Sequence, residues 1–145
     1  MDSNLKREII LDNYSNPFNK STEGVEGYIK VNSNNESCID NIDLYIKVKD
    51  NIIEDISFDG EACVISISST SIMTDLLKGK TIDEALLIIK NFDNMIEEKE
   101  YDEKLLNDAL CFDDVAKQPS RKKCATLSWH GLYNKLNQIK NNKIN

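Results

Sequence analysis

The chain is organised around the stretch Phe58-Asp59-Gly60-Glu61-Ala62-Cys63, followed by Val64-Ile65-Ser66-Ile67-Ser68-Ser69-Thr70-Ser71-Ile72-Met73. An alternating strand runs into a turn, the turn ends on Cys63, and a segment of small residues follows. The pattern therefore places a thiol at a strand-to-helix corner. Free amides and the helix dipole favour a thiolate at such a corner. The alternative is a small buried residue that fills the junction between sheet and helix.

Three segments show the alternation of apolar and polar residues that is typical of β-strands. The clearest is Ile42–Val48, and a tight turn at Asp50-Asn51 joins it to Ile52–Phe58, whose first residue is expected on the apolar face. Gly24–Val31 is the third. Each strand has one apolar face, and only helices remain in the sequence to cover these faces. The sequence therefore predicts an α+β fold, a three-stranded antiparallel sheet covered by about five helices.

The expected helices are recognised by apolar spacing and by capping residues. Thr81-Ile82-Asp83-Glu84 is a capping box, and Gly79 is a good stop for the helix before it. That preceding helix has one apolar face, and its small residues are expected to allow close packing on the sheet. Pro119 is expected to break the chain. The predicted helices are Ser3–Tyr14, Val64–Lys78, Thr81–Ile96, Asp102–Leu110 and a last helix that starts near Lys122 to Cys124.

Length and composition narrow the class of protein. The 145 residues, 40% of them hydrophobic, suit one domain over residues 1–145, with a frayed tail from about residue 140. No apolar run approaches the length of a membrane span, and the N-terminus lacks a signal-peptide segment, so we expect a cytoplasmic protein that does not bind membranes. A net charge of −7 argues against nucleic-acid binding. The four cysteines are then expected to be reduced.

Two further cysteines stand beside polar or charged residues. Cys38 ends the polar loop Asn32–Cys38, and residues two apart in extended chain share a side, so Cys38 and Asp40 can face one metal ion. The alternative is a buried thiol followed by a turn aspartate. Cys124 follows Arg121-Lys122-Lys123, whose cations favour a thiolate; alternatively it is a helix residue beside a solvated basic patch.

Together, three cysteines and one aspartate form a set suited to tetrahedral zinc. The set is Cys38, Asp40, Cys63 and Cys124. A hard carboxylate among soft thiolates holds zinc less tightly than four thiolates would. Such a weak fourth ligand suits a site at which a ligand leaves and a thiol reacts.

Two other candidate ligands are set aside. His130 lies six residues after Cys124, about 240° around a helix, so the two cannot readily share one metal ion. Cys111 is expected to be packed, or to be a spare thiol, because it lies between Leu110 and Phe112.

With these motifs in view, the chain resembles the U-type iron–sulfur cluster assembly proteins, whose fold is described as SufE/IscU-like. Lys123 stands where the IscU branch has a histidine, and the IscU chaperone-docking segment is absent, so the resemblance favours the SUF-system (SufU-type) branch. The matching blocks are Ile10 to Pro17, Asn35-Glu36-Ser37-Cys38-Ile39-Asp40, Phe58 to Met73, and Pro119 to Trp129.

The resemblance implies a zinc ion held by Cys38, Asp40, Cys63 and Cys124, with Cys38 as the catalytic thiol. It implies a zinc-dependent sulfurtransferase that takes persulfide sulfur from a PLP-dependent, SufS-type cysteine desulfurase, with a downstream SUF scaffold as a further partner. Arg121 matches a family residue implicated in docking or transfer.

The chain also departs from the family pattern. Glu36, Ile39 and Ala62 replace a proline and two glycines. Glycine often serves backbone positions with positive φ, so we expect a changed conformation in the Cys38 loop.

Two other functions stay open. The same four residues can serve a scaffold on which a [2Fe-2S] cluster is assembled. Alternatively, zinc is structural and the protein is a non-catalytic module that binds the desulfurase.

Overall fold

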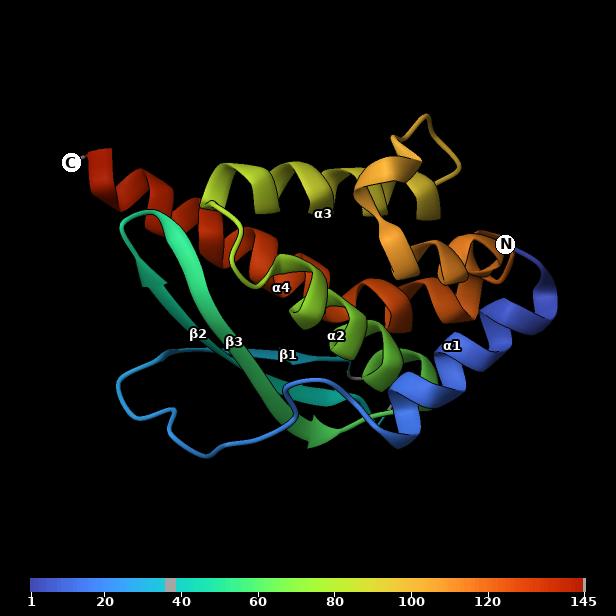
Figure 1. The fold of residues 1–145 in the computed structure, drawn as a ribbon, viewed down its shortest axis with the longest axis horizontal. Helices are drawn as coiled ribbons and strands as arrows, with labels where there is room; N and C mark the ends of the chain where they lie inside the picture. Colours follow the sequence, from blue (N-terminus) through green and yellow to red (C-terminus); the bar gives the residue numbers. More distant parts are fainter. Residues whose placement is uncertain (36–38, 145) are drawn as a thin grey trace.

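The computed structural model, which describes residues 1–35 and 39–144, has the predicted α+β architecture (Figure 1). Its strands form one antiparallel sheet in the order β1-β2-β3. In chain order the elements are α1 (Ser3–Ser15), β1 (Ile29–Asn34), β2 (Asn41–Lys49), β3 (Ile52–Glu61), α2 (Val64–Leu77), α3 (Ile82–Ile96), the 3₁₀ segments η1 (Glu103–Leu105) and η2 (Asn107–Lys117), and α4 (Pro119–Ile144).

The sheet buries one face, as the alternation predicts. Ile42, Leu44 and Ile46 of β2 are fully buried, whereas the residues between them are at least partly exposed. The helices gather on the buried side, where α4 packs on β1 and β2, and α2 packs on β3 (Figure 1). Such one-sided cover is usual for an antiparallel sheet.

A bulge corrects the predicted face of β3. The register between β2 and β3 shifts at Lys47 and Val48, so that Lys47 pairs with Asp55 and Val48 pairs with Ile53. A bulge inserts one extra residue and so reverses the alternation beyond it. Ile53 is therefore fully buried, and Ile52, which we expected on the apolar face, is 39% exposed.

The first strand is displaced from its predicted position. Gly24 and Gly27 have φ values of +71° and +84°, so they form turns, and β1 begins only at Ile29. It then continues to Asn34, into the segment that we expected to be a loop. Asn32 allows this because its side-chain amide donates hydrogen bonds to the side chains of Asn41 (2.7 Å) and Asp43 (3.0 Å) on β2.

Helix α2 is the centre of the helical layer. Its bounds are close to those predicted, and Ser66, Ser69 and Thr70 are as buried as its apolar residues. These small residues pack α2 against α4 through hydrogen bonds. The hydroxyl of Ser69 donates to the carbonyl of Ala125 (2.6 Å), and the hydroxyls of Thr70 and Ser128 lie 2.6 Å apart.

The C-terminal half shows one confirmed prediction and two corrections. The capping box at Thr81 and Glu84 opens α3 as predicted. Asp102–Leu110, predicted as one short helix, is divided between the 3₁₀ segments η1 and η2, and η2 continues to Lys117. Pro119 does not break the chain but opens α4, where its missing N–H removes no helical hydrogen bond. Helix α4 is tied to α3 by Trp129, which stacks on Phe92 with ring centroids 3.9 Å apart.

One glycine is required where the sheet meets the loop before β2. Gly60 has a φ of +142°, and a Cβ atom there would overlap the backbone carbonyl oxygen of Asn41. Gly60 pairs with Ile42, which lies two residues after Asp40. Cys63 lies three residues after Gly60, beyond the end of β3. The absence of a side chain at residue 60 therefore allows the segments that carry Asp40 and Cys63 to approach each other closely.

We predict that Gly60→Ala lowers the free energy of unfolding by about 3 kcal/mol, from backbone strain and steric overlap. Urea unfolding measured by circular dichroism checks this. Gly27→Ala is the matched control, because its φ is also positive and nothing lies within 4 Å of the added Cβ; it should cost only about 1 kcal/mol. Equal losses in the two variants would contradict the steric argument.

Candidate metal site

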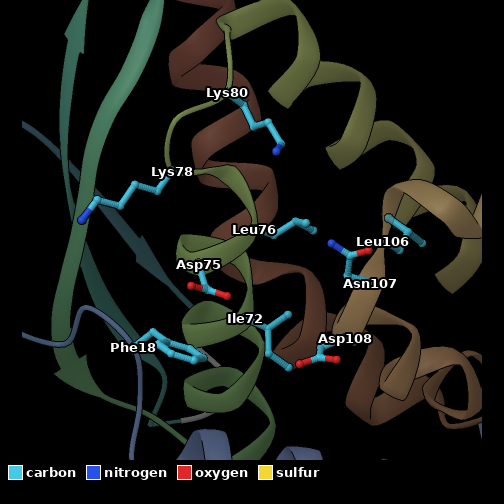
Figure 2. Close-up of a pocket in the computed structure, with 9 residues that line it drawn as sticks. All are labelled: Phe18, Ile72, Asp75, Leu76, Lys78, Lys80, Leu106, Asn107 and Asp108. Carbon is cyan, nitrogen blue, oxygen red and sulfur yellow. The ribbon is translucent and has the colours of Figure 1, made fainter.

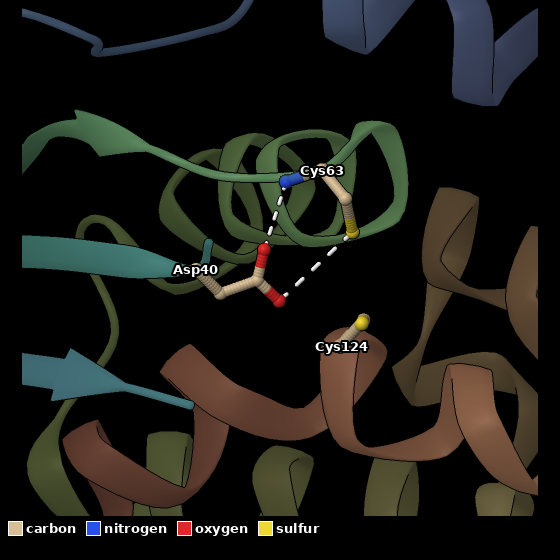
Figure 3. A group of neighbouring side chains, drawn as sticks. All are labelled: Asp40, Cys63 and Cys124. Atoms are coloured by element: carbon tan, nitrogen blue, oxygen red, sulfur yellow. Dashed lines mark hydrogen bonds between the residues drawn. The ribbon is translucent and has the colours of Figure 1, made fainter. Parts of the chain in front are cut away.

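Three of the four predicted ligands meet at one point of the structure. Asp40 precedes β2, Cys63 caps the start of α2, and Cys124 lies near the start of α4 (Figure 3). A carboxylate oxygen of Asp40 and the sulfurs of Cys63 and Cys124 all lie within 4.8 Å of one another. Cys38, the fourth predicted ligand, lies outside the described residues.

Cys63 occupies the corner that the sequence predicts. It is the N-cap residue of α2, with φ −70° and ψ 169°, and its sulfur accepts a hydrogen bond from the backbone N–H of Ser66 at 3.5 Å. The side chain therefore lies over the free amides of the first helical turn.

Asp40 is 1% exposed, and donors meet both of its carboxylate oxygens. Oδ1 accepts from the backbone N–H of Cys63 at 2.8 Å. Oδ2 accepts from the hydroxyl of Ser66 at 2.6 Å and faces the thiol of Cys63 at 3.9 Å. A buried carboxylate needs such donors, because removal from water otherwise disfavours its charge.

Cys124 is only 8% exposed, and its thiol donates weakly to the backbone carbonyl of Ser120, 3.9 Å away. Burial, followed by the proximity of Cys63 and Asp40, raises the pKa of the Cys124 thiol to about 12. Without a cation the sulfur therefore keeps its proton at neutral pH. A metal ion that binds there replaces the proton and removes the cost of a buried negative charge.

The donor set fits zinc. Two sulfurs and one carboxylate oxygen are ligand types that zinc takes in proteins, and atoms bonded to one tetrahedral zinc lie about 3.5–4 Å apart. Side chains that already meet within 4.8 Å need only small rotations to reach that spacing. The three described donors leave one tetrahedral position for a fourth ligand.

Ser66 is a further site residue, one that the sequence motifs did not indicate. Its hydroxyl bonds Asp40 and also lies 3.5 Å from the sulfur of Cys63 and 3.1 Å from the backbone carbonyl oxygen of Cys124. The available signal was its place three residues after Cys63, where a helical side chain returns to the N-cap.

Arg121, the predicted docking residue, is exposed in the first turn of α4, one turn before Cys124. Its neighbour Lys122 pairs with Glu97 of the segment after α3, with 3.8 Å between nitrogen and oxygen. Arg121 thus lies on the surface beside the site, and its docking role stays a prediction.

The two residues set aside lie away from the cluster. His130 is exposed, and its Nε2 atom lies 2.8 Å from a carboxylate oxygen of Asp93. Cys111 is 2% exposed in η2, among core residues. Burial, with the charges of Asp108 and Asp113, raises the pKa of the Cys111 thiol to about 12. The packing expected of Cys111 is confirmed.

A separate cavity of about 280 Å³ lies between α2 and η2 (Figure 2). Lys78 contributes to its rim but turns toward β3, where its amine lies 3.0 Å from Asp55. No cysteine or histidine is found among the lining residues that the structure describes, so this cavity is distinct from the thiol cluster. The lining residues are Phe18, Ile72, Asp75, Leu76, Lys78, Lys80, Leu106, Asn107 and Asp108.

Comparison with known proteins gives the family. Residues 5–125 match the family described as NifU-like N terminal domain. The chain belongs to this family. None of its helices, within residues 1–35 and 39–144, is long and apolar enough to cross a membrane.

Relatives of this NifU-like chain cover most of its length. It is 45% identical over 129 residues to the zinc-dependent sulfurtransferase SufU of Bacillus subtilis, which covers 88% of the chain and 86% of that protein. It is 38% identical over 132 residues to the iron–sulfur cluster assembly scaffold protein IscU of Streptococcus pyogenes, and this match covers 90% of the chain and 81% of that protein. A crystal structure of a putative iron–sulfur cluster assembly scaffold protein for the SUF system from Fervidobacterium islandicum superposes with a TM-score of 0.77 at 35% identity, covering 86% of this chain and 91% of that one.

The buried Cys111 thiol predicts a pH dependence of stability. The folded state keeps this proton to about pH 12, whereas the thiol of the unfolded chain loses it near pH 9, so stability falls as pH rises through that window. In the presence of chelator, the free energy of unfolding of wild type should therefore fall by about 1.4 kcal/mol more than that of Cys111→Ala when the pH is raised from about 8 to about 10. Urea unfolding of both proteins at both pH values measures this change. If the difference in free energy of unfolding between the two proteins is the same at both pH values, the raised pKa of Cys111 is contradicted.

Proposed function

We propose that the protein is a zinc-dependent sulfurtransferase of the SufU type, which accepts persulfide sulfur from a PLP-dependent cysteine desulfurase for iron–sulfur cluster assembly. The observation that carries the proposal is the convergence of Asp40, Cys63 and Cys124 within 4.8 Å. Its similarity to the SufU of Bacillus subtilis, at 45% identity over 88% of the chain, supports the same function.

In this proposal, Cys63, Cys124 and Asp40 are protein ligands of zinc and Cys38 is the fourth. Bound zinc supplies a positive charge that keeps the coordinating thiols deprotonated. The anchoring role falls to Cys63 and Asp40, because the N–H of Cys63 already binds the carboxylate and fixes the two side chains relative to each other.

Cys38 is the proposed sulfur acceptor. Its thiolate attacks the outer sulfur of the persulfide on the desulfurase, so that a new sulfur–sulfur bond forms on Cys38. The original sulfur–sulfur bond breaks, and the cysteine of the desulfurase leaves as a thiolate. The step exchanges one sulfur–sulfur bond for another and needs no external oxidant or reductant. Arg121, exposed one turn before Cys124, supplies a cation for the docking or transfer of the persulfide.

A cluster scaffold is the second candidate, favoured by the 38% identity to the IscU scaffold of Streptococcus pyogenes. It would use the same ligands, because thiolates also hold [2Fe-2S] clusters. Anaerobic reconstitution with iron and sulfide, followed by absorption spectroscopy, separates the two functions. A stable cluster that passes to an apo-acceptor favours the scaffold.

For the sulfurtransferase, elemental analysis of the purified protein should find about one zinc per chain. Cys63→Ala and Cys124→Ala should each lose most of it. Cys111→Ala is the matched control, because it removes a buried cysteine outside the cluster and should keep zinc. Zinc-free wild-type protein would contradict the proposal.

The catalytic role of Cys38 has its own prediction. Cysteine desulfurase turnover in the presence of a reductant should rise with added wild-type protein, whereas Cys38→Ala should give no stimulation, because the accepting thiol is gone. Cys111→Ala should stimulate like wild type. Full stimulation by Cys38→Ala would contradict its catalytic role and favour the non-catalytic, desulfurase-binding alternative.

A further inference from the structure

The hydroxyl of Ser66 touches all three described residues of the thiol cluster. It lies 2.6 Å from Oδ2 of Asp40, 3.1 Å from the backbone carbonyl oxygen of Cys124 and 3.5 Å from the sulfur of Cys63. Its single hydrogen goes to Asp40, because that distance is the shortest and the acceptor is charged. The oxygen of the hydroxyl is then free to accept from the Cys63 thiol.

This bond completes the fixation of the Asp40 carboxylate. The backbone N–H of Cys63 holds Oδ1, and this bond does not itself contact Oδ2. The Ser66 hydroxyl holds Oδ2, the oxygen that faces the sulfur of Cys63. With both oxygens bonded, the plane of the carboxylate is set before any cation arrives.

Ser66 itself has little freedom. It is 1% exposed in the first turn of α2, where its own N–H binds the sulfur of Cys63. The element that carries one thiol ligand therefore also carries the hydroxyl that orients the carboxylate. A change in the position of α2 moves both together.

We propose that Ser66 is a positioning residue of the metal site, which orients the Asp40 carboxylate as a ligand and thereby sets the affinity for zinc. The inference rests on the proposed function, because it assigns Asp40 to zinc. Ser66 does not bind the metal; it acts through the carboxylate. Hydrogen-bond partners of metal ligands commonly contribute about 10- to 100-fold to metal affinity.

Ser68 provides a matched control on the same helix. It is fully buried, and its hydroxyl donates to the carbonyls of Val64 (2.7 Å) and Ile65 (3.2 Å) within α2. Ser68→Ala therefore removes the same atoms from the same helix without removing a bond to the Asp40 carboxylate.

The test is a zinc titration of each full-length variant against a chromophoric chelator. Ser66→Ala should weaken zinc binding about 10- to 100-fold, and Ser68→Ala should stay within about twofold of wild type. In an Asp40→Ala background, Ser66→Ala should have no further effect, because its action passes through that carboxylate. Cobalt(II) absorption spectra should change in Ser66→Ala and not in Ser68→Ala.

If Ser66→Ala does not fold, Ser66→Thr and Ser66→Val answer the question, because they have the same shape and differ by the hydroxyl. Ser66→Thr should bind zinc at least about tenfold more tightly than Ser66→Val. Equal affinity in that pair, wild-type affinity in Ser66→Ala, or an undiminished effect in the Asp40→Ala background overturns the inference. Wild-type protein without zinc affinity overturns the proposed function instead.

Discussion

A row of buried hydroxyls fixes how α2 and α4 pack against each other. The Ser69 hydroxyl donates to the carbonyl of Ala125 and accepts from the indole N–H of Trp129 at 2.8 Å, and the hydroxyls of the adjacent Thr70 and of Ser128 also meet between the two helices. Each buried polar atom left without a partner would cost about 1–3 kcal/mol, so the two helices fit together in one register. Cys63 caps one of these helices and Cys124 lies on the other, so this register also sets the distance between the two thiols.

The carboxylate comes from the sheet, and its placement is a consequence of strand pairing. Asn41 pairs with Glu61, which brings the residue before β2 beside the residues after β3. Gly60 permits that approach because a Cβ there would meet the carbonyl oxygen of Asn41. The cluster therefore lies where the sheet, α2 and α4 meet, and no single segment could form it alone. A site of this kind needs the complete fold, unlike a loop that holds all its ligands in one short sequence.

The sequence predicted those parts of the fold that depend on local patterns, such as the alternation of β2 and the capping box of α3. Errors arose where contacts distant in sequence decide. The bulge that buries Ile53 in place of Ile52 depends on the pairing of β3 with β2, and the strand character of Asn32 depends on amide bonds to β2. Ser66 was missed as a site residue for the same reason, since a serine in a helix reveals its acceptor only when another segment is placed beside it.

The backbone near Cys63 accommodates one departure from the family pattern, the replacement of a glycine by Ala62. Ala62 stands where that pattern has a glycine, two residues after Gly60. At residue 60 the φ of +142° and the carbonyl of Asn41 leave no room for a side chain. Ala62 does not have a positive φ, so its methyl group adds no such backbone strain. Replacement of the family glycine by Ala62 therefore leaves the corner at Cys63 intact, with its backbone N–H still bound to Asp40.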